Sequence, residues 1–192
     1  MSMRDALILS AATALLALGL GTGASLAQQG YGGPYGFGTT AGEQEIAAVD
    51  IDAMPDGRGL PPGGGTYVQG AEVYAVQCAA CHGEQLEGIP DLGGDKLIGG
   101  RGSLASGSPI KTIESYWPYA TTVFDYVKRA MPFPAPGSLS DDEVYAVSAF
   151  ILAEAGIIGR DQVMNATTLP EVLMPNRDGF VPDPRPDVHD YD

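Results

Sequence analysis

The chain's only two cysteines lie three positions apart and are followed directly by a histidine, in the string Cys78-Ala79-Ala80-Cys81-His82. Cysteines at i and i+3 near the end of a helix face the same way, so both thiols can bond to vinyl groups at one edge of a porphyrin. The adjacent histidine then lies where it can bind the iron, which is why C-x-x-C-H is the spacing of a c-type haem attachment site. The string predicts one covalent haem c, held by Cys78 and Cys81, with His82 as the proximal iron ligand.

Other uses of the two cysteines explain the string less well. A disulfide between residues so close together closes a very small loop and restricts the unfolded chain little. A thioredoxin-like dithiol needs a βαβ pattern, which the sequence lacks. A zinc site needs four ligands, and His189 is the only further cysteine or histidine in the chain. We therefore expect haem attachment.

Residues 1–27 have the layout of a cleavable secretory signal peptide. Arg4 supplies a positive start, an apolar run follows, and Ser25-Leu26-Ala27 is a small-residue cleavage site. The apolar run lasts only about fifteen residues, whereas a spanning helix needs roughly twenty. We expect a periplasmic protein with no membrane span in the mature chain, and retention of the signal as an anchor stays an open alternative.

The formal net charge is −14. A chain of this charge repels the phosphates of nucleic acids, which excludes a nucleic-acid partner. It attracts basic protein surfaces and speeds encounter with them.

The rest of the chain divides by composition. Residues 28–65 are rich in glycine and proline and predict an extended arm, ordered at most around residues 46–51, that is either a linker or a partner-binding segment. Residues 66–156 carry the helical signals and predict the cytochrome domain. Residues 157–192 contain several prolines and no sustained periodicity, and predict an extended tail that wraps the domain or a partner.

Two stretches flank a glycine-rich loop at 84–109 and predict helices. Residues 67–81 carry apolar side chains three and four apart, and Gly83 is placed to end that helix. Its expected apolar face is Val68, Ala71, Tyr74, Ala75 and Cys78. Residues 118–130 predict the next helix, which stops at Met131 because a proline follows it.

The last helix has the strongest signals. Ser140 and Glu143 have the spacing of a capping box, in which each side chain bonds the other residue's backbone N–H. Gly156 is placed at its C-terminus. The buried stripe is predicted at Val144, Val147, Phe150, Ile151 and Leu152.

The second iron ligand decides what such a haem can do. Met131 lies between two predicted helices in a loop stiffened by prolines, which favours it as the distal ligand. Met174 is its main rival, and Met54, Met164 and His189 are further alternatives, although methionine most often fills core space. A His/Met pair occupies both axial positions and raises the reduction potential, which predicts single-electron transfer.

Two further residues are candidates for contacts with the haem. Arg101 lies in a glycine-rich string, where it either pairs with a haem propionate or is a solvated surface arginine. Trp117 either lines the haem crevice and hydrogen-bonds a propionate or is ordinary core packing.

Several longer strings resemble the cytochrome c subunit of bacterial sulfur-oxidation dehydrogenases, the Sox sulfane/sulfite dehydrogenase type. The C-x-x-C-H string itself is shared by every class of c-type cytochrome. The matching strings are Ile51-Asp52, Pro55-Asp56-Gly57-Arg58-Gly59-Leu60-Pro61-Pro62-Gly63, Cys78 to Gly83, Gly99-Gly100-Arg101-Gly102, Lys111 to Thr122, Arg129-Ala130-Met131-Pro132-Phe133, and Met174-Pro175-Asn176-Arg177-Asp178-Gly179-Phe180. The most specific are Ser115-Tyr116-Trp117-Pro118-Tyr119-Ala120 and the last of these strings.

This resemblance implies a class I cytochrome c fold, a small all-α bundle around one haem in which the first and last helices cross. It implies Cys78 and Cys81 as haem attachments, with His82 and Met131 as axial ligands. The subunit would accept electrons from a molybdopterin-containing dehydrogenase subunit that oxidises a sulfur compound, and pass them to a soluble or membrane-bound cytochrome. Some members carry a second C-x-x-C-H domain where this chain has one string, which leaves the substrate open.

Two other functions stay open at this point. One is a free-standing electron shuttle, and the other is a haem enzyme or ligand sensor with an open iron site. The chain has no catalytic centre of its own beyond the haem, so catalysis would belong to a complex.

Overall fold

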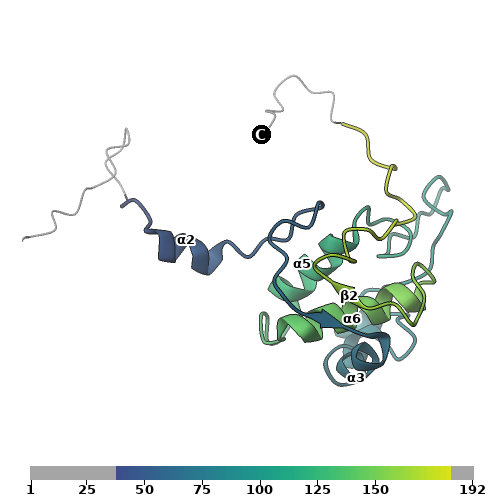
Figure 1. Ribbon diagram of the computed structural model, residues 1–192. Coiled ribbons are helices and arrows are strands. Elements are labelled where there is room, and N and C mark those ends of the chain that lie inside the picture. The colour runs from purple at the N-terminus through teal and green to yellow at the C-terminus, as the bar shows by residue number, and fades with distance from the viewer. Residues whose placement is uncertain (1–37, 183–192) are drawn as a thin grey trace, which may run out of the picture. The chain divides into compact units, whose positions relative to one another are not determined.

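The computed structural model describes residues 38–182 (Figure 1). The signal-peptide prediction, the start of the arm and His189 lie outside the described residues. The chain divides into two compact units, Met1–Ala47 and Ala48–Asp192. A short helix, α2 (Glu43–Val49), lies where they join, and none of its residues is buried.

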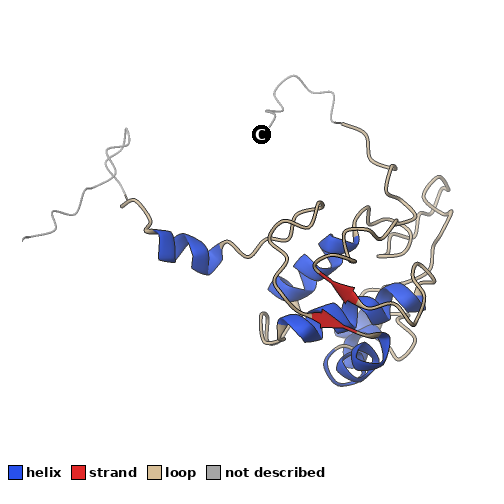
Figure 2. Ribbon diagram, in the orientation of Figure 1, coloured by secondary structure: helices blue, strands red, loops and turns tan. Residues whose placement is uncertain are grey.

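The second unit holds the remaining elements, and helices dominate it (Figure 2). The helices are α3 (Tyr67–Gln77), α4 (Ala79–His82), the 3-10 turn η1 (Pro90–Leu92), α5 (Ala120–Ala130) and α6 (Asp141–Glu154). Two short strands, β1 (Gly64–Gly65) and β2 (Met164–Asn165), pair antiparallel and lie on α6. The predicted all-α class is confirmed, and the small ladder is an addition that the sequence did not predict.

Helix α6 is the centre of the core. Its capping box forms as predicted, because the Ser140 hydroxyl accepts from the Glu143 N–H and the Glu143 carboxylate accepts from the Ser140 N–H at 2.8 Å. Gly156 follows the helix with φ +65°. Every residue from Val144 to Ala153 is buried, so the helix is enclosed on all sides rather than along the predicted stripe alone.

Helices α3 and α6 cross at a glycine, which confirms the expected crossing. A Cβ on Gly70 would overlap the Ala146 carbonyl, so the two backbones approach more closely than any other residue allows. The rings of Tyr67 and Tyr74 lie 5.4 and 5.0 Å from that of Phe150 and fill the space beside this contact.

The predicted apolar face of α3 is only partly correct. Tyr74 is buried and Ala71 and Cys78 lie against the core, but Val68 and Ala75 are exposed. The helix also ends earlier than predicted, because Cys78 adopts φ −123° and ψ −39° and separates α3 from α4. The buried face is therefore rotated toward Gly70, where a missing side chain allows the close approach.

The chain is attached to this unit well before residue 66. The Ala53 N–H donates to Asp125 on α5 at 2.9 Å, the Tyr145 hydroxyl donates to the Pro61 carbonyl at 2.8 Å, and the Gly64 N–H donates to Asp142 at 2.8 Å. The second half of the predicted arm is therefore part of the domain surface. Glycine and proline content concealed this, because the contacts use backbone groups.

The segment after α6 also belongs to the core for much of its length. Met164, Leu169, Val172 and Met174 are all buried. Of the two alternatives for the tail, wrapping the domain holds up to Met174. No helix in residues 38–182 is long and apolar enough to cross a membrane.

Candidate haem site

The cysteine string lies at a break between two helices. Cys78 ends α3 and begins α4, and its carbonyl accepts from the N–H groups of Cys81 at 3.1 Å and His82 at 2.9 Å. This single turn fixes the two cysteines and the histidine relative to one another. Both thiols are free, and burial raises the pKa of Cys78 to about 11.

The loop after α4 folds back over the motif. The Gly88 N–H donates to the His82 carbonyl at 2.8 Å and the Ile89 N–H donates to the Cys81 carbonyl at 2.9 Å. A Cβ on Gly94 would overlap the backbone of Cys81, so this close approach needs glycine. The loop thereby satisfies the last carbonyls of the short helix and holds the motif in place.

The buried hydroxyl of Tyr74 fastens the other side of the motif. It donates to the Gly83 carbonyl at 2.7 Å, and burial raises the pKa of this tyrosine, so it stays a neutral donor. Gly83 has φ +79°, a conformation that favours glycine and turns the chain away from α4.

The half-buried His82 ring is oriented by the backbone. Its Nδ1 lies 2.7 Å from the carbonyl oxygen of Asp95. A carbonyl only accepts hydrogen bonds, so Nδ1 carries the proton, and in the neutral ring Nε2 is the nitrogen with the lone pair. Metal-binding histidines commonly have this arrangement, with the second ring nitrogen donating to a backbone carbonyl.

Met131 ends α5 and differs from the other described methionines. It is half-buried and packs against the hydrophobic core, and its peptide bond to the following proline is cis. Met164 and Met174 are fully enclosed in the core, and Met54 is exposed. Of the four, Met131 is the one that lies at the edge of the core, where its sulfur can face a bound group.

Trp117 lies against the same hydrophobic cluster as Cys78 and Met131. Its ring packs edge-on against Tyr126, with centroids 5.7 Å apart. Contact of Trp117 with a haem stays a prediction.

Arg101 has protein partners of its own. Its Nε lies 2.9 Å from a carboxylate oxygen of Glu114, and one terminal nitrogen donates to the Ala155 carbonyl at 3.0 Å. These bonds join the glycine-rich loop to the end of α6. Two of the three guanidinium nitrogens of Arg101 thus already have partners within the protein. The predicted contact of Arg101 with a propionate stays a prediction.

The residues present fit a covalent haem. Two free thiols lie on one turn beside an imidazole with an unprotonated Nε2, and a thioether lies at the edge of the same core.

Sequence reasoning missed Asp95, Gly94 and Tyr74 as parts of this site. Asp95 acts through its carbonyl, which every residue has, so no side-chain signal marks it. Gly94 lies in a glycine-rich stretch where one close approach cannot be singled out. Tyr74 was predicted only as part of an apolar face.

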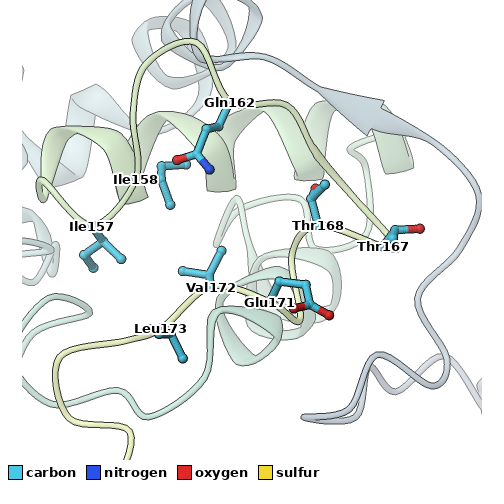
Figure 3. A pocket seen from close by; sticks show the side chains of 8 residues that line it. All are labelled: Ile157, Ile158, Gln162, Thr167, Thr168, Glu171, Val172 and Leu173. Carbon is cyan, nitrogen blue, oxygen red and sulfur yellow. The ribbon is translucent and has the colours of Figure 1, made fainter.

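A cavity of about 460 Å³ lies apart from the cysteine string, in the segment after α6 (Figure 3). Glu171 is the only titratable side chain that lines it, and no nucleophilic thiol or histidine does. The other lining residues are Ile157, Ile158, Gln162, Thr167, Thr168, Val172 and Leu173. This lining offers no acid–base pair for sulfur chemistry.

Comparison with known proteins decides the family. Residues 65–151 match the family model described as cytochrome c oxidase, cbb3-type, subunit III. The crystal structure of the sulfane dehydrogenase SoxCD from Paracoccus pantotrophus contains a chain that is 45% identical, with a TM-score of 0.72, over 78% of this chain and 73% of that one. The chain belongs to the c-type cytochromes. The cytochrome's helical fold and its covalent haem c are thus confirmed, as is the resemblance to the Sox type.

Two curated relatives match over shorter stretches. The thiosulfate dehydrogenase of Stutzerimonas stutzeri (strain A1501) is 32% identical over 93 residues, which are 47% of the cytochrome and 28% of that protein. The thiosulfate dehydrogenase of Allochromatium vinosum is 31% identical over 114 residues, 54% of the cytochrome and 38% of that protein. The cytochrome thus spans well under half the length of these relatives.

Proposed function

We propose that the cytochrome is the electron-transfer subunit of a periplasmic molybdenum dehydrogenase that oxidises an inorganic sulfur compound. The observation that carries this proposal is its 45% identity to a sulfane dehydrogenase chain over 78% of its length. The cytochrome itself contributes no substrate-oxidising centre in this proposal. It takes electrons from the molybdenum subunit and passes them to a soluble or membrane-bound cytochrome.

Each site residue has a separate task. Cys78 and Cys81 attach one haem, Nε2 of His82 is the proximal ligand, and Met131 is the distal ligand. When bound, the haem supplies a reversible one-electron change at its iron. The carbonyl of Asp95 holds the proton on Nδ1 of His82 and so keeps the ring oriented. A haem iron held by both His82 and Met131 would have no open position for a substrate.

The absorption spectrum of the exported protein tests the site. We expect a low-spin spectrum with the weak red band of sulfur-to-iron ligation, and one haem per chain in a haem assay. A high-spin spectrum that responds to added ligands would instead support a haem enzyme or sensor.

The partner is tested by purification from native cells under mild conditions. We expect the cytochrome to co-purify with a molybdenum-containing protein, and its haem to be reduced when that complex receives a sulfur substrate. Thiosulfate is to be tried because the two curated relatives are named thiosulfate dehydrogenases. Sulfite is to be tried because the chain resembles the Sox sulfane/sulfite dehydrogenase type. A cytochrome that purifies alone, and that no molybdenum protein reduces, would be a free-standing shuttle.

A further inference from the structure

The haem site does not use Tyr116 or residues 176–180, which belong to two of the strings that carry the resemblance, and the structure brings them together. The Asn176 side chain donates to the Tyr116 carbonyl at 2.7 Å, across sixty positions of sequence. The ring of Phe180 packs edge-on against that of Tyr116, with centroids 5.2 Å apart. Tyr116, Asn176 and Phe180 therefore lie together in the folded chain.

Each string places a cation over a tyrosine of this surface. The Lys111 Nζ lies 5.2 Å from the ring centroid of Tyr116, and the Arg177 guanidinium lies 4.6 Å from that of Tyr119. Neither cation has a carboxylate within salt-bridge distance among residues 38–182. By contrast, every other arginine in that range has one, namely Arg58, Arg101, Arg129 and Arg160.

An arginine without a carboxylate partner among residues 38–182 is unusual in a chain with a net charge of −14. Carboxylates are plentiful here, so an arginine without one has its charge available for another molecule. Stacking on a tyrosine ring holds each cation in place while leaving its N–H donors free.

The surface also has apolar and concave parts. Phe180 is 51% and Val181 is 85% exposed. Beside Phe180 lies a hollow of about 390 Å³, whose lining includes Leu104, Pro109, Lys111 and Tyr116. Lys111, Tyr116 and Phe180 line this hollow, and arginine, tyrosine and phenylalanine are enriched at protein interfaces.

We propose that Lys111, Tyr116, Tyr119, Arg177 and Phe180, the stacked-cation surface, bind the catalytic subunit through carboxylates that this subunit presents around an apolar side chain. This inference rests on the proposed function. An acidic partner is repelled by most of the cytochrome's surface and attracted here. The two cations therefore set the orientation in which the subunits meet.

The test measures the affinity of purified haem-containing cytochrome for the purified catalytic subunit that co-purifies with it. We expect the double variant Lys111→Gln/Arg177→Gln to bind about a hundredfold more weakly at low ionic strength, with the deficit shrinking as salt rises. Phe180→Ala should bind about tenfold more weakly at every salt concentration. The matched control Arg58→Gln removes one exposed positive charge elsewhere and should stay within about twofold.

Three results would overturn the inference. The first is unchanged affinity in the double variant. The second is an altered haem spectrum or midpoint potential in Arg177→Gln without loss of affinity, which would direct this cation at the haem. The third is the same affinity loss in a variant that ends at Pro182. That loss would mean that the two cations act by binding the four aspartates beyond Pro182, and not by binding the partner directly.

The proposed function fails separately. If the wild-type cytochrome binds no molybdenum subunit at all, both proposals fall. If the wild type binds and the double variant binds equally well, only the stacked-cation surface falls.

Discussion

The imidazole of His82 owes its orientation to a backbone carbonyl rather than to another side chain. Because the Asp95 carbonyl can only accept, the proton stays on Nδ1, and Nε2 is the ring nitrogen that would bind a metal. Burial distinguishes the two main candidates for the distal methionine. Met131 lies half-buried at the end of α5, whereas Met174 is enclosed in the core.

We expect Met131→Ala to lose the red sulfur–iron band and to lower the midpoint potential, because the thioether stabilises the ferrous state. Absorption spectroscopy and redox titration of the haem-containing protein measure both. Met174→Ala is the matched control. It should keep the band and lose about 2–5 kcal/mol of unfolding free energy, as buried methionines do. Loss of the band in Met174→Ala instead would reverse the ligand assignment.

At the scale of elements, α6 is the helix on which the others pack. Its crossing with α3 depends on Gly70, whose missing side chain admits the Ala146 carbonyl, and its start depends on the Ser140–Glu143 box. The first contact is steric and the second is electrostatic, so they respond to different changes.

We expect Gly70→Ala to lower the unfolding free energy by about 1–3 kcal/mol, because the added methyl group forces the two helices apart. Urea unfolding of the haem-containing protein measures this. Gly107→Ala is the control, since its added Cβ meets nothing and its backbone needs no positive φ. It should stay within about 0.5 kcal/mol of the wild type. Equal effects of the two substitutions would mean that the helices do not meet at Gly70.

The capping box predicts a dependence on pH. Hydrogen bonds from the hydroxyl and N–H of Ser140 hold the pKa of Glu143 below its ordinary value. Its contribution to stability is therefore present above about pH 4.3 and is lost as pH falls through the lowered pKa.

Glu143→Gln should cost less than about 1 kcal/mol at pH 7, since Glu143 is only partly buried and solvent screens its charge, and the deficit should close below about pH 4. The measurement is thermal unfolding of both proteins between about pH 3 and pH 7, a range that includes the ordinary glutamate pKa. A deficit that is the same at both ends of this range would contradict an ionised cap.

At the scale of the whole molecule, two irregular segments enclose the helices. Residues 53–65 attach to α5 and α6 through hydrogen bonds, and residues 164–174 contribute four buried side chains. The two meet in the ladder of β1 and β2. The cytochrome domain is thus larger than the helices alone.

Deletions on the two sides of this attachment should behave differently. Removing residues 28–47 should leave the spectrum and the unfolding free energy within about 0.5 kcal/mol of the wild type, because no described residue of that segment is buried. Removing residues 28–63 should cost several times more, about 2–4 kcal/mol, because the Tyr145 hydroxyl loses the Pro61 carbonyl and the Asp125 carboxylate loses the Ala53 N–H. Equal stability of the two variants would show that residues 48–63 do not support the fold.

Much of the molecule was predictable because the signals are local. The spacing of Cys78, Cys81 and His82, the capping box and the proline after Met131 each act within a few residues. They therefore predict the haem, the start of α6 and the end of α5 without any knowledge of the fold. The longer strings predicted the family in the same way.

Tertiary structure decided what depends on contacts between distant segments. Which face of α3 is buried was set by the absence of a side chain at Gly70, a steric condition that an apolar pattern does not record. The partner of the His82 ring was set by a carbonyl of Asp95, a group that every residue has. Where the domain begins was set by backbone hydrogen bonds in a glycine- and proline-rich segment. The haem motif alone determined what is bound, and the folded chain determined how its ligand is held and which surface is left free.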